Sequence, residues 1–158
     1  MKRFLMGFLV VAGMLVGSLN AQAAPDFSGT WVLDLDKSEL GVKNMPADKQ
    51  AQLKKVTIVI EQTASQLTIK LSTGDTASYN LDGSPSSNAL PDGTKATTMT
   101  KWDGDSLVST TTYDIGGQNV ETHDVRSLDG SGKVMTLQIT RQMPSGEMKK
   151  SLIYNKQD

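Results

Sequence analysis

Few residues of this 158-residue chain could perform acid–base or metal chemistry. It has one histidine, His123, and no cysteine, which excludes thiol nucleophiles and cysteine metal ligands. Thr122-His123-Asp124 could form a base with an orienting acid, but adjacent residues of a strand point to opposite faces. His123 is therefore predicted to be a strand-surface or pocket-wall residue. We assign no catalytic residue and predict that the chain is not an enzyme.

The acidic residues do not form a metal site. Asp34-x-Asp36-x-Ser38 begins like a calcium loop, yet Glu39 stands where the sharp turn needs glycine and Met45 where a bidentate acid belongs. No pair of carboxylates stands out for glycoside chemistry. The sequence predicts no metal and no cofactor.

The N-terminal segment has the layout of a secretory signal peptide. Lys2 and Arg3 precede the apolar run Phe4–Val16, and Ala21-Gln22-Ala23 is a small-x-small cleavage site. The apolar run is shorter than the ~20 residues that a membrane-spanning helix needs. We expect cleavage of residues 1–23, one domain over residues 24–158, export to the periplasm or medium, and no membrane span after cleavage.

Charge argues against nucleic acid as a partner. The chain has 16 Lys and Arg and 17 Asp and Glu, and loss of Lys2 and Arg3 would leave a net charge of −3. Phosphate contacts from basic side chains supply most of the affinity of nucleic-acid binders. A weakly acidic chain without a basic cluster is therefore predicted to bind none.

The remaining sequence is typical of an all-β protein. Short alternating segments are separated by Gly, Asp, Asn and Ser about every ten residues, which favours a sandwich or barrel. Tight turns such as Asp103-Gly104 join consecutive strands into an antiparallel up-and-down meander, and closure into a barrel would remove its exposed edges. The predicted strands are Gly29–Leu35, Lys54–Gln62, Gln66–Ser72, Thr76–Leu81, Thr94–Trp102, Ser106–Asp114, Asn119–Leu128, Lys133–Arg141 and Glu147–Lys156.

Two connections are longer than the rest. Asp36–Leu53 either contains a short helix that opens at Pro46 or forms an ordered loop. Leu81–Gly93 is predicted to be a loop that elaborates one rim of the barrel.

Alternation along the strands predicts which residues face inward. The last two strands place Arg141, Tyr154 and Lys150 among apolar residues of the same face. A packed interior rarely accepts such polar groups unpaired. Either the barrel encloses a wet or ligand-filled cavity, or these side chains lie at its rims and reach solvent.

Phe27-Ser28-Gly29-Thr30-Trp31 resembles the Gly-x-Trp opening of the lipocalins and fatty-acid-binding proteins, which belong to the calycin superfamily. Lys101–Leu107 resembles a Trp-Asp-Gly hairpin of the fatty-acid-binding branch. The opening, Leu35-Asp36-Lys37-Ser38 and the ending Ser151–Lys156 together are similar to exported bacterial lipocalin-like proteins. This resemblance implies a small calycin-like barrel of about 8–10 strands, the size at which such a barrel has room for side chains or one small ligand.

The resemblance also implies two residue roles. In lipocalins the tryptophan closes the barrel bottom beneath a late-strand arginine, a cation–π contact. Trp31 is the predicted plug, with Arg141 as its partner and Arg126 as the alternative. Fatty-acid-binding proteins hold the ligand carboxylate with an arginine two residues before the tyrosine of the last strand, where this chain has Leu152. Fatty-acid binding is therefore not inherited.

Two functions remain open. The leading one is a soluble exported barrel that binds or carries a small lipophilic ligand. Its expected contacts are the polar anchors Tyr113, Arg141 and Tyr154 and the flexible or apolar Met135, Met148 and Leu152.

The alternative is a periplasmic protein-interaction module, such as an inhibitor or envelope assembly factor. Its barrel would be solidly packed, and its loops would contact an envelope protein. A cavity of a few hundred cubic ångströms, roughly the size of a ligand pocket, discriminates between the two.

Overall fold

The computed structural model describes residues 24–41, 45–143 and 146–158. The predicted signal peptide, residues 1–23, lies outside the described residues. The elements are β1 (Gly29–Leu33), α1 (Ala47–Leu53), β2 (Thr57–Gln62), β3 (Gln66–Leu71), β4 (Thr76–Asn80), β5 (Asp82–Ala89), β6 (Lys95–Asp103), β7 (Ser106–Ile115), β8 (Gln118–Leu128), β9 (Val134–Met143) and β10 (Gly146–Lys156).

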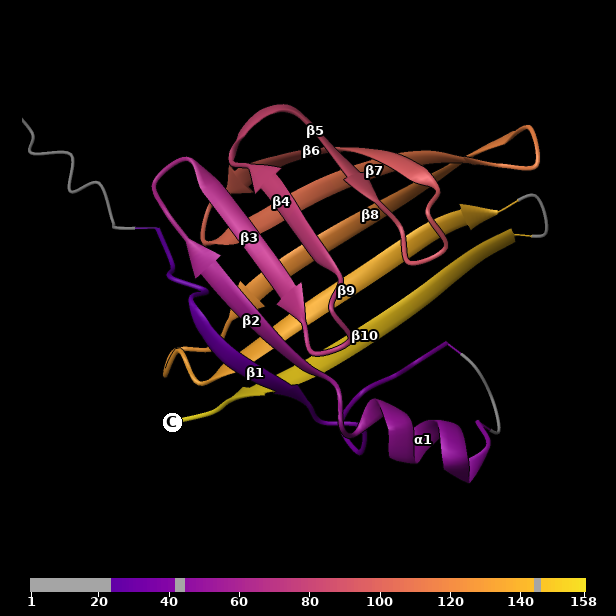
Figure 1. The fold of residues 1–158 in the computed structure, drawn as a ribbon. Helices are drawn as coiled ribbons and strands as arrows, with labels where there is room; N and C mark the ends of the chain where they lie inside the picture. The colour runs from indigo at the N-terminus through magenta and orange to yellow at the C-terminus, as the bar shows by residue number, and fades with distance from the viewer. Residues whose placement is uncertain (1–23, 42–44, 144–145) are drawn as a thin grey trace, which may run out of the picture.

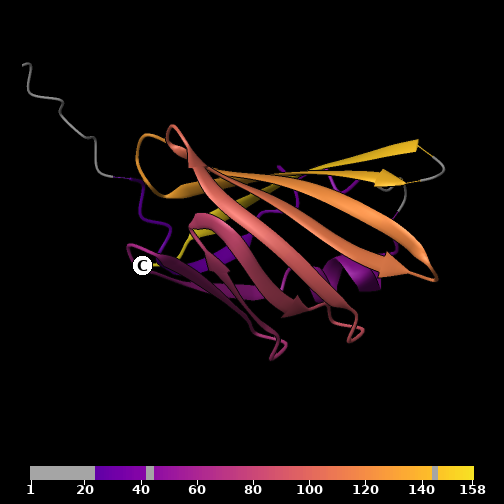
Figure 2. The same cartoon turned by 90° about the horizontal axis from the view of Figure 1, so that it is seen from above.

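The strands form one antiparallel sheet of ten strands in the order β4-β3-β2-β1-β10-β9-β8-β7-β6-β5. Except for β4 and β5, consecutive strands pair with each other, and β1 also pairs with β10, so the first and last strands lie side by side. The sheet curls until β4 and β5, its two edges, meet (Figures 1 and 2). The predicted all-β meander is confirmed, as a nearly closed barrel of ten strands.

The prediction that Leu81–Gly93 is a loop is wrong, because β5 occupies most of it. β5 pairs with β6, with a register shift between Asp82 and Pro85. Its sequence, DGSPSSNA, has little β-propensity. Pro85 is tolerated because β5 is an edge strand, where a missing N–H breaks no ladder on the open side.

The open question over Asp36–Leu53 is answered by α1, a helix of seven residues. Asp48 lies in its first turn, where a negative charge complements the helix dipole. The helix lies at the end of the barrel where β1 ends and β2 begins (Figure 1). Among the described residues, no helix has the length and apolar character that crossing a membrane requires.

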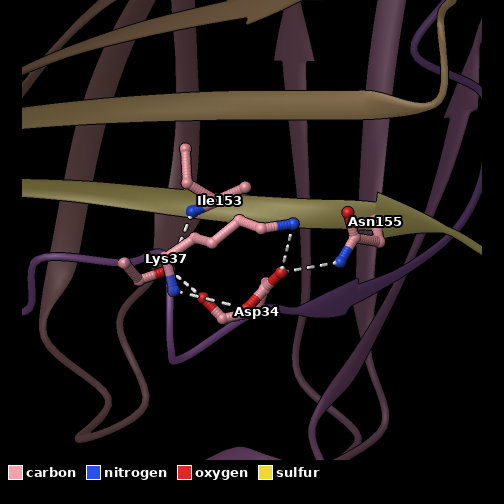
Figure 3. Close-up of polar contacts among 5 residues, drawn as sticks. Asp34, Lys37, Ile153 and Asn155 are labelled. Carbon is pink, nitrogen blue, oxygen red and sulfur yellow. Dashed lines mark hydrogen bonds and ion pairs between the residues drawn. The ribbon is translucent and has the colours of Figure 1, made fainter.

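Polar contacts fasten the start of this connection to β10 (Figure 3). Asn155 donates from Nδ2 to Asp34 Oδ2 at 3.1 Å, and Lys37 Nζ lies 3.2 Å from the same oxygen. Ser38 donates from Oγ to the Asp34 carbonyl at 2.6 Å and accepts from the Ile153 amide at 2.9 Å. These contacts position the segment that leads to α1 over the end of the barrel.

A cluster of apolar side chains, which we call the plug, fills the other end of the barrel. Trp31 is fully buried and donates from Nε1 to the Phe27 carbonyl at 2.9 Å. The buried plug residues are Phe27, Trp31, Ile58, Ile60, Leu67, Ile69, Leu81, Leu107 and Met135.

The cation over Trp31 is Lys156, and the predicted Arg141–Trp31 pair is wrong. Lys156 faces Trp31 across the β1–β10 ladder, and its Nζ lies 5.4 Å from the ring centroid. Arg141 instead lies over Tyr113, at 5.7 Å. Gly29 has a φ of 134°, and a Cβ there would lie 2.5 Å from Lys156 Cε, so the lysine stem uses the space that the glycine leaves open.

Side chains, in place of a backbone ladder, close the β4–β5 seam. Asn88 accepts from the Ser78 amide through Oδ1 and donates to the Ser78 carbonyl through Nδ2, both at 2.9 Å. The Asn80 amide donates to Ser86 Oγ at 2.7 Å. Asn88 thus does for Ser78 what a neighbouring strand's backbone would do.

Asn88→Ala is expected to lower the free energy of unfolding by about 1–3 kcal/mol, because it leaves a backbone donor and acceptor of Ser78 unpaired. Urea unfolding measures the loss, and faster hydrogen exchange at the Ser78 amide locates it. Ser87→Ala, an exposed neighbour on the same strand, is the control. Equal effects of the two substitutions would contradict the assigned role of Asn88.

Candidate functional site

An apolar cavity of about 350 Å³, which we call the first cavity, lies between the inner face of the barrel and α1. Leu53 of α1 contributes to its wall together with inward residues of β1, β2, β3, β9 and β10. Its lining residues are Leu33, Leu40, Met45, Leu53, Val56, Ile58, Leu71, Ile139, Lys150, Leu152 and Tyr154. Its size is near the lower end of the range found for small-molecule pockets, about 300–1,000 Å³.

A second cavity of about 190 Å³ lies against the inner face of β4 to β9. It shares Ile139 with the first cavity, so the two adjoin inside the barrel. Its lining is more polar and consists of Ala77, Tyr79, Asn88, Ala89, Leu90, Ala96, Thr98, Thr111, Tyr113, Thr122, Asp124, Ile139 and Arg141.

Period-two alternation along β8 places polar side chains inside the barrel. Thr122, Asp124 and Arg126 share the inward face because they are two residues apart. Arg141 of β9 lies opposite Thr122 and donates from Nε to its hydroxyl at 3.3 Å. These residues, which lie far from α1 in the sequence, meet beside the cavities only when the sheet curls.

Arg126 is buried inside the barrel and lines neither cavity. The residue is 8% exposed, and its Nε has no hydrogen-bond partner among the described residues. Burial raises the pKa of Tyr79 and of Tyr154, and the Arg126 charge opposes both shifts. Tyr79 borders the second cavity and Tyr154 the first, so the guanidinium acts electrostatically on a wall of each.

The position of Arg126 bears on the arginine that fatty-acid-binding proteins carry where this chain has Leu152. Arg126 pairs in register with Leu137, and Leu137 with Leu152, so the three form one row across β8, β9 and β10. A buried cation is therefore present at the level of Leu152, two strands away. Sequence comparison along the last strand misses it, because the positive charge comes from another strand.

Asp124 is the acidic side chain among the described lining residues of the two cavities. Burial raises the pKa of its carboxyl, and the charges of Arg126 and Arg141 act in the opposite direction. Its Oδ1 has no hydrogen-bond partner in the described part of the structure. Within the described part of the chain, no ion pair includes it.

The structure distributes the predicted ligand contacts over four places. Leu152 and Tyr154 line the first cavity, and Tyr113 and Arg141 line the second. Met135 is fully buried in the plug and lines neither cavity.

Met148 is half-buried and lies opposite Arg141 across the β9–β10 ladder, away from the lining of both cavities. The roles of these residues in ligand binding stay predictions.

His123 lies on the outer face of β8. Its Nε2 is 2.7 Å from Glu121 Oε1, and its side chain is 43% exposed. Asp124, the next residue, belongs to the inward set and borders the second cavity. The two side chains therefore cannot act together as a base and its orienting acid.

Sequence reasoning missed Asp124 and Tyr79 as cavity residues and Arg126 as a buried cation that acts on them. The signal was present in β8, where Val120, Thr122, Asp124, Arg126 and Leu128 alternate with outward residues. A strand that carries an acid and an arginine on the same face as valine and leucine indicates a polar interior.

The sequence matches no protein-family model, and no curated protein is significantly similar to it. Many solved structures are similar in fold, among them the following two. Zebrafish ileal bile acid-binding protein, in complex with cholic acid, has a TM-score of 0.58 at 15% identity over 83% of this chain and 98% of its own. The protein described as REP1-NXSQ fatty acid transporter has a TM-score of 0.62 at 22% identity over 85% of this chain and 98% of its own. The chain therefore shares its fold, an antiparallel barrel of ten strands, with these two proteins.

Proposed function

We propose that this protein is an exported carrier that holds one small lipophilic acid inside its barrel. The observation that carries the proposal is the apolar first cavity of about 350 Å³. Leu53 of α1 forms part of its wall, and it adjoins the more polar second cavity. A solidly packed barrel would have no such space. Transfer of an apolar ligand surface into it is favourable by roughly 25 cal/mol per Å² before ordering costs.

The charges inside the barrel favour an acidic ligand. Lys150 borders the first cavity, Arg141 borders the second, and the buried Arg126 acts electrostatically on a tyrosine of each wall, whereas Asp124 is the one acid among the described lining residues. An uncompensated buried cation is costly, and a ligand carboxylate would supply the missing partner. The bile acid-binding protein of similar fold is described in complex with cholic acid, and the other protein is described as a fatty acid transporter. Both kinds of compound are lipophilic acids.

The cavities also argue against the packed interaction module. That alternative required a solid core and recognition through loops. The Asp36–Leu53 connection instead places Leu40, Met45 and Leu53 over the first cavity. Its apolar side chains face the lumen, which suits a cover over a ligand better than a surface for a protein partner.

Native mass spectrometry of the protein purified from its own host's periplasm or medium tests the proposal. We expect the measured mass of the polypeptide to be that of a chain that begins at Ala24, because cleavage after Ala23 removes the signal peptide. We also expect a discrete added mass that is released on denaturation and ionises as an acid. A protein that stays bare after incubation with a total lipid extract would refute the carrier function, and an intact N-terminus would refute cleavage.

A further inference from the structure

Hydroxyl and amide groups line much of the second cavity, but the protein itself already uses several of them. Thr98 and Thr111 share a hydrogen bond of 2.9 Å between their hydroxyls. Thr122 accepts from Arg141, and Asn88 is occupied by the backbone of Ser78. These groups form a wall whose hydrogen bonds are internally satisfied.

Asp124 is different, because its carboxylate borders the cavity and keeps an unused acceptor. Oδ1 has no partner among the described residues. The terminal torsion of an aspartate is broad, so a small rotation exchanges which oxygen faces the cavity. A buried acceptor without a donor costs free energy, and a donor brought by a ligand would recover it.

The surroundings of Asp124 select the kind of donor. Arg126 lies two residues along the same inward face, and Arg141 borders the same cavity from β9. These two guanidiniums disfavour an ammonium group there. A second carboxylate is also disfavoured, because an ionised carboxylate only accepts hydrogen bonds and cannot donate one to Asp124. A neutral hydroxyl can donate to Asp124 and carries no charge that the two guanidiniums repel.

From this geometry we infer that the second cavity is a subsite for a hydroxyl-bearing part of the ligand, with the Asp124 carboxylate accepting the hydroxyl's hydrogen bond. The inference deepens the proposed function and rests on it. The ligand class becomes a hydroxylated lipophilic acid, in which the acid lies near Arg126, the apolar body fills the first cavity and a hydroxyl reaches Asp124. If Asp124 is protonated, its carbonyl oxygen still accepts the hydroxyl's hydrogen bond, and the preference is then smaller because the bond is no longer charge-assisted.

The test uses two rigid probes that differ in hydroxyl groups alone. Cholic acid carries three hydroxyls, and lithocholic acid has the same skeleton and acid with one. Calorimetric titration of the purified mature protein is expected to show cholic acid binding about 10- to 100-fold more tightly, the range for a hydrogen bond to a charged group. Asp124→Leu, which keeps similar bulk and removes both oxygens, is expected to abolish that preference.

Two further variants separate recognition from a structural effect. Asp124→Asn keeps one acceptor oxygen and is expected to retain part of the preference, which also covers the case in which Asp124→Leu fails to fold. Glu121→Gln removes a negative charge from the outer face of the same strand and should leave the ratio of affinities unchanged.

The outcomes are distinct. Equal affinity of the wild-type protein for the two probes, or a ratio that survives Asp124→Leu, would overturn the hydroxyl subsite and leave the carrier function standing. Failure of both probes to bind would count against the proposed acid carrier and remove the inference with it.

Discussion

Trp31→Ala is expected to lower the free energy of unfolding by about 3–5 kcal/mol, the range for truncation of a buried aromatic side chain. Trp31 is fully buried, packs in the plug and donates its indole hydrogen to the Phe27 carbonyl. Its removal leaves a cavity and an unpaired carbonyl, and deprives Lys156 of the ring beneath it. Urea and thermal unfolding, followed by circular dichroism, measure the loss.

Trp102→Ala is the matched control, since Trp102 is the other tryptophan of the chain. It stacks on Phe27 with ring centroids 6.0 Å apart, but it is partly exposed. We expect it to cost less than Trp31→Ala. A loss below about 1 kcal/mol for Trp31→Ala would show that this side chain is not the structural plug, because core aromatic truncations cost several times more.

Arg126→Met is expected to abolish a preference for acids over alcohols. The wild-type protein should bind hexadecanoic acid at least about 30-fold more tightly than hexadecan-1-ol, which corresponds to roughly 2 kcal/mol for a buried charge pair. Arg126 is buried, and its Nε has no hydrogen-bond partner among the described residues, so a carboxylate beside it gains a charge interaction that a hydroxyl does not replace. Displacement of a fluorescent lipophilic probe by each ligand measures the ratio.

Lys101→Met is the control for loss of a positive charge, because Lys101 is exposed on the outer face of β6. It should leave the acid-to-alcohol ratio unchanged. Thermal unfolding of Arg126→Met shows whether the variant is folded, and Met suits the site because it fills irregular apolar space. The assignment of Arg126 as the anion anchor would be refuted by either of two results. One is equal binding of acid and alcohol by the wild-type protein, and the other is an Arg126→Met variant that keeps the preference.

Local sequence was sufficient for most of the strands. Alternation and turn residues predicted the meander, and the hairpin at Asp103-Gly104 joins β6 and β7 as expected. β5 was missed because Gly, Pro, Asp and Ser are poor strand formers, and its strand conformation comes from pairing with β6. Tertiary pairing overrode local propensity at that edge.

For the Gly-x-Trp segment, local sequence predicts the burial of the tryptophan but not the residue that contacts it. Burial of Trp31 follows from its place on the first strand, and the structure confirms it. Its cationic partner does not follow, because contact depends on which strands pair and in which register. Lys156 lies opposite Trp31 in the β1–β10 ladder, which brings residues 125 positions apart into contact. Arg141 instead lies near the end of β9, over Tyr113.

By itself, the sequence determined the all-β class, the order of nine of the ten strands and the inward face of the last two, because these depend on local alternation and turn chemistry. The tertiary structure alone decided that the barrel keeps cavities, that side chains close the β4–β5 seam, and that Arg126 and Asp124 lie beside the lumen. Those features depend on how far the sheet curls and on which inward side chains then meet. Curvature and register are properties of the whole sheet, and no single strand encodes them.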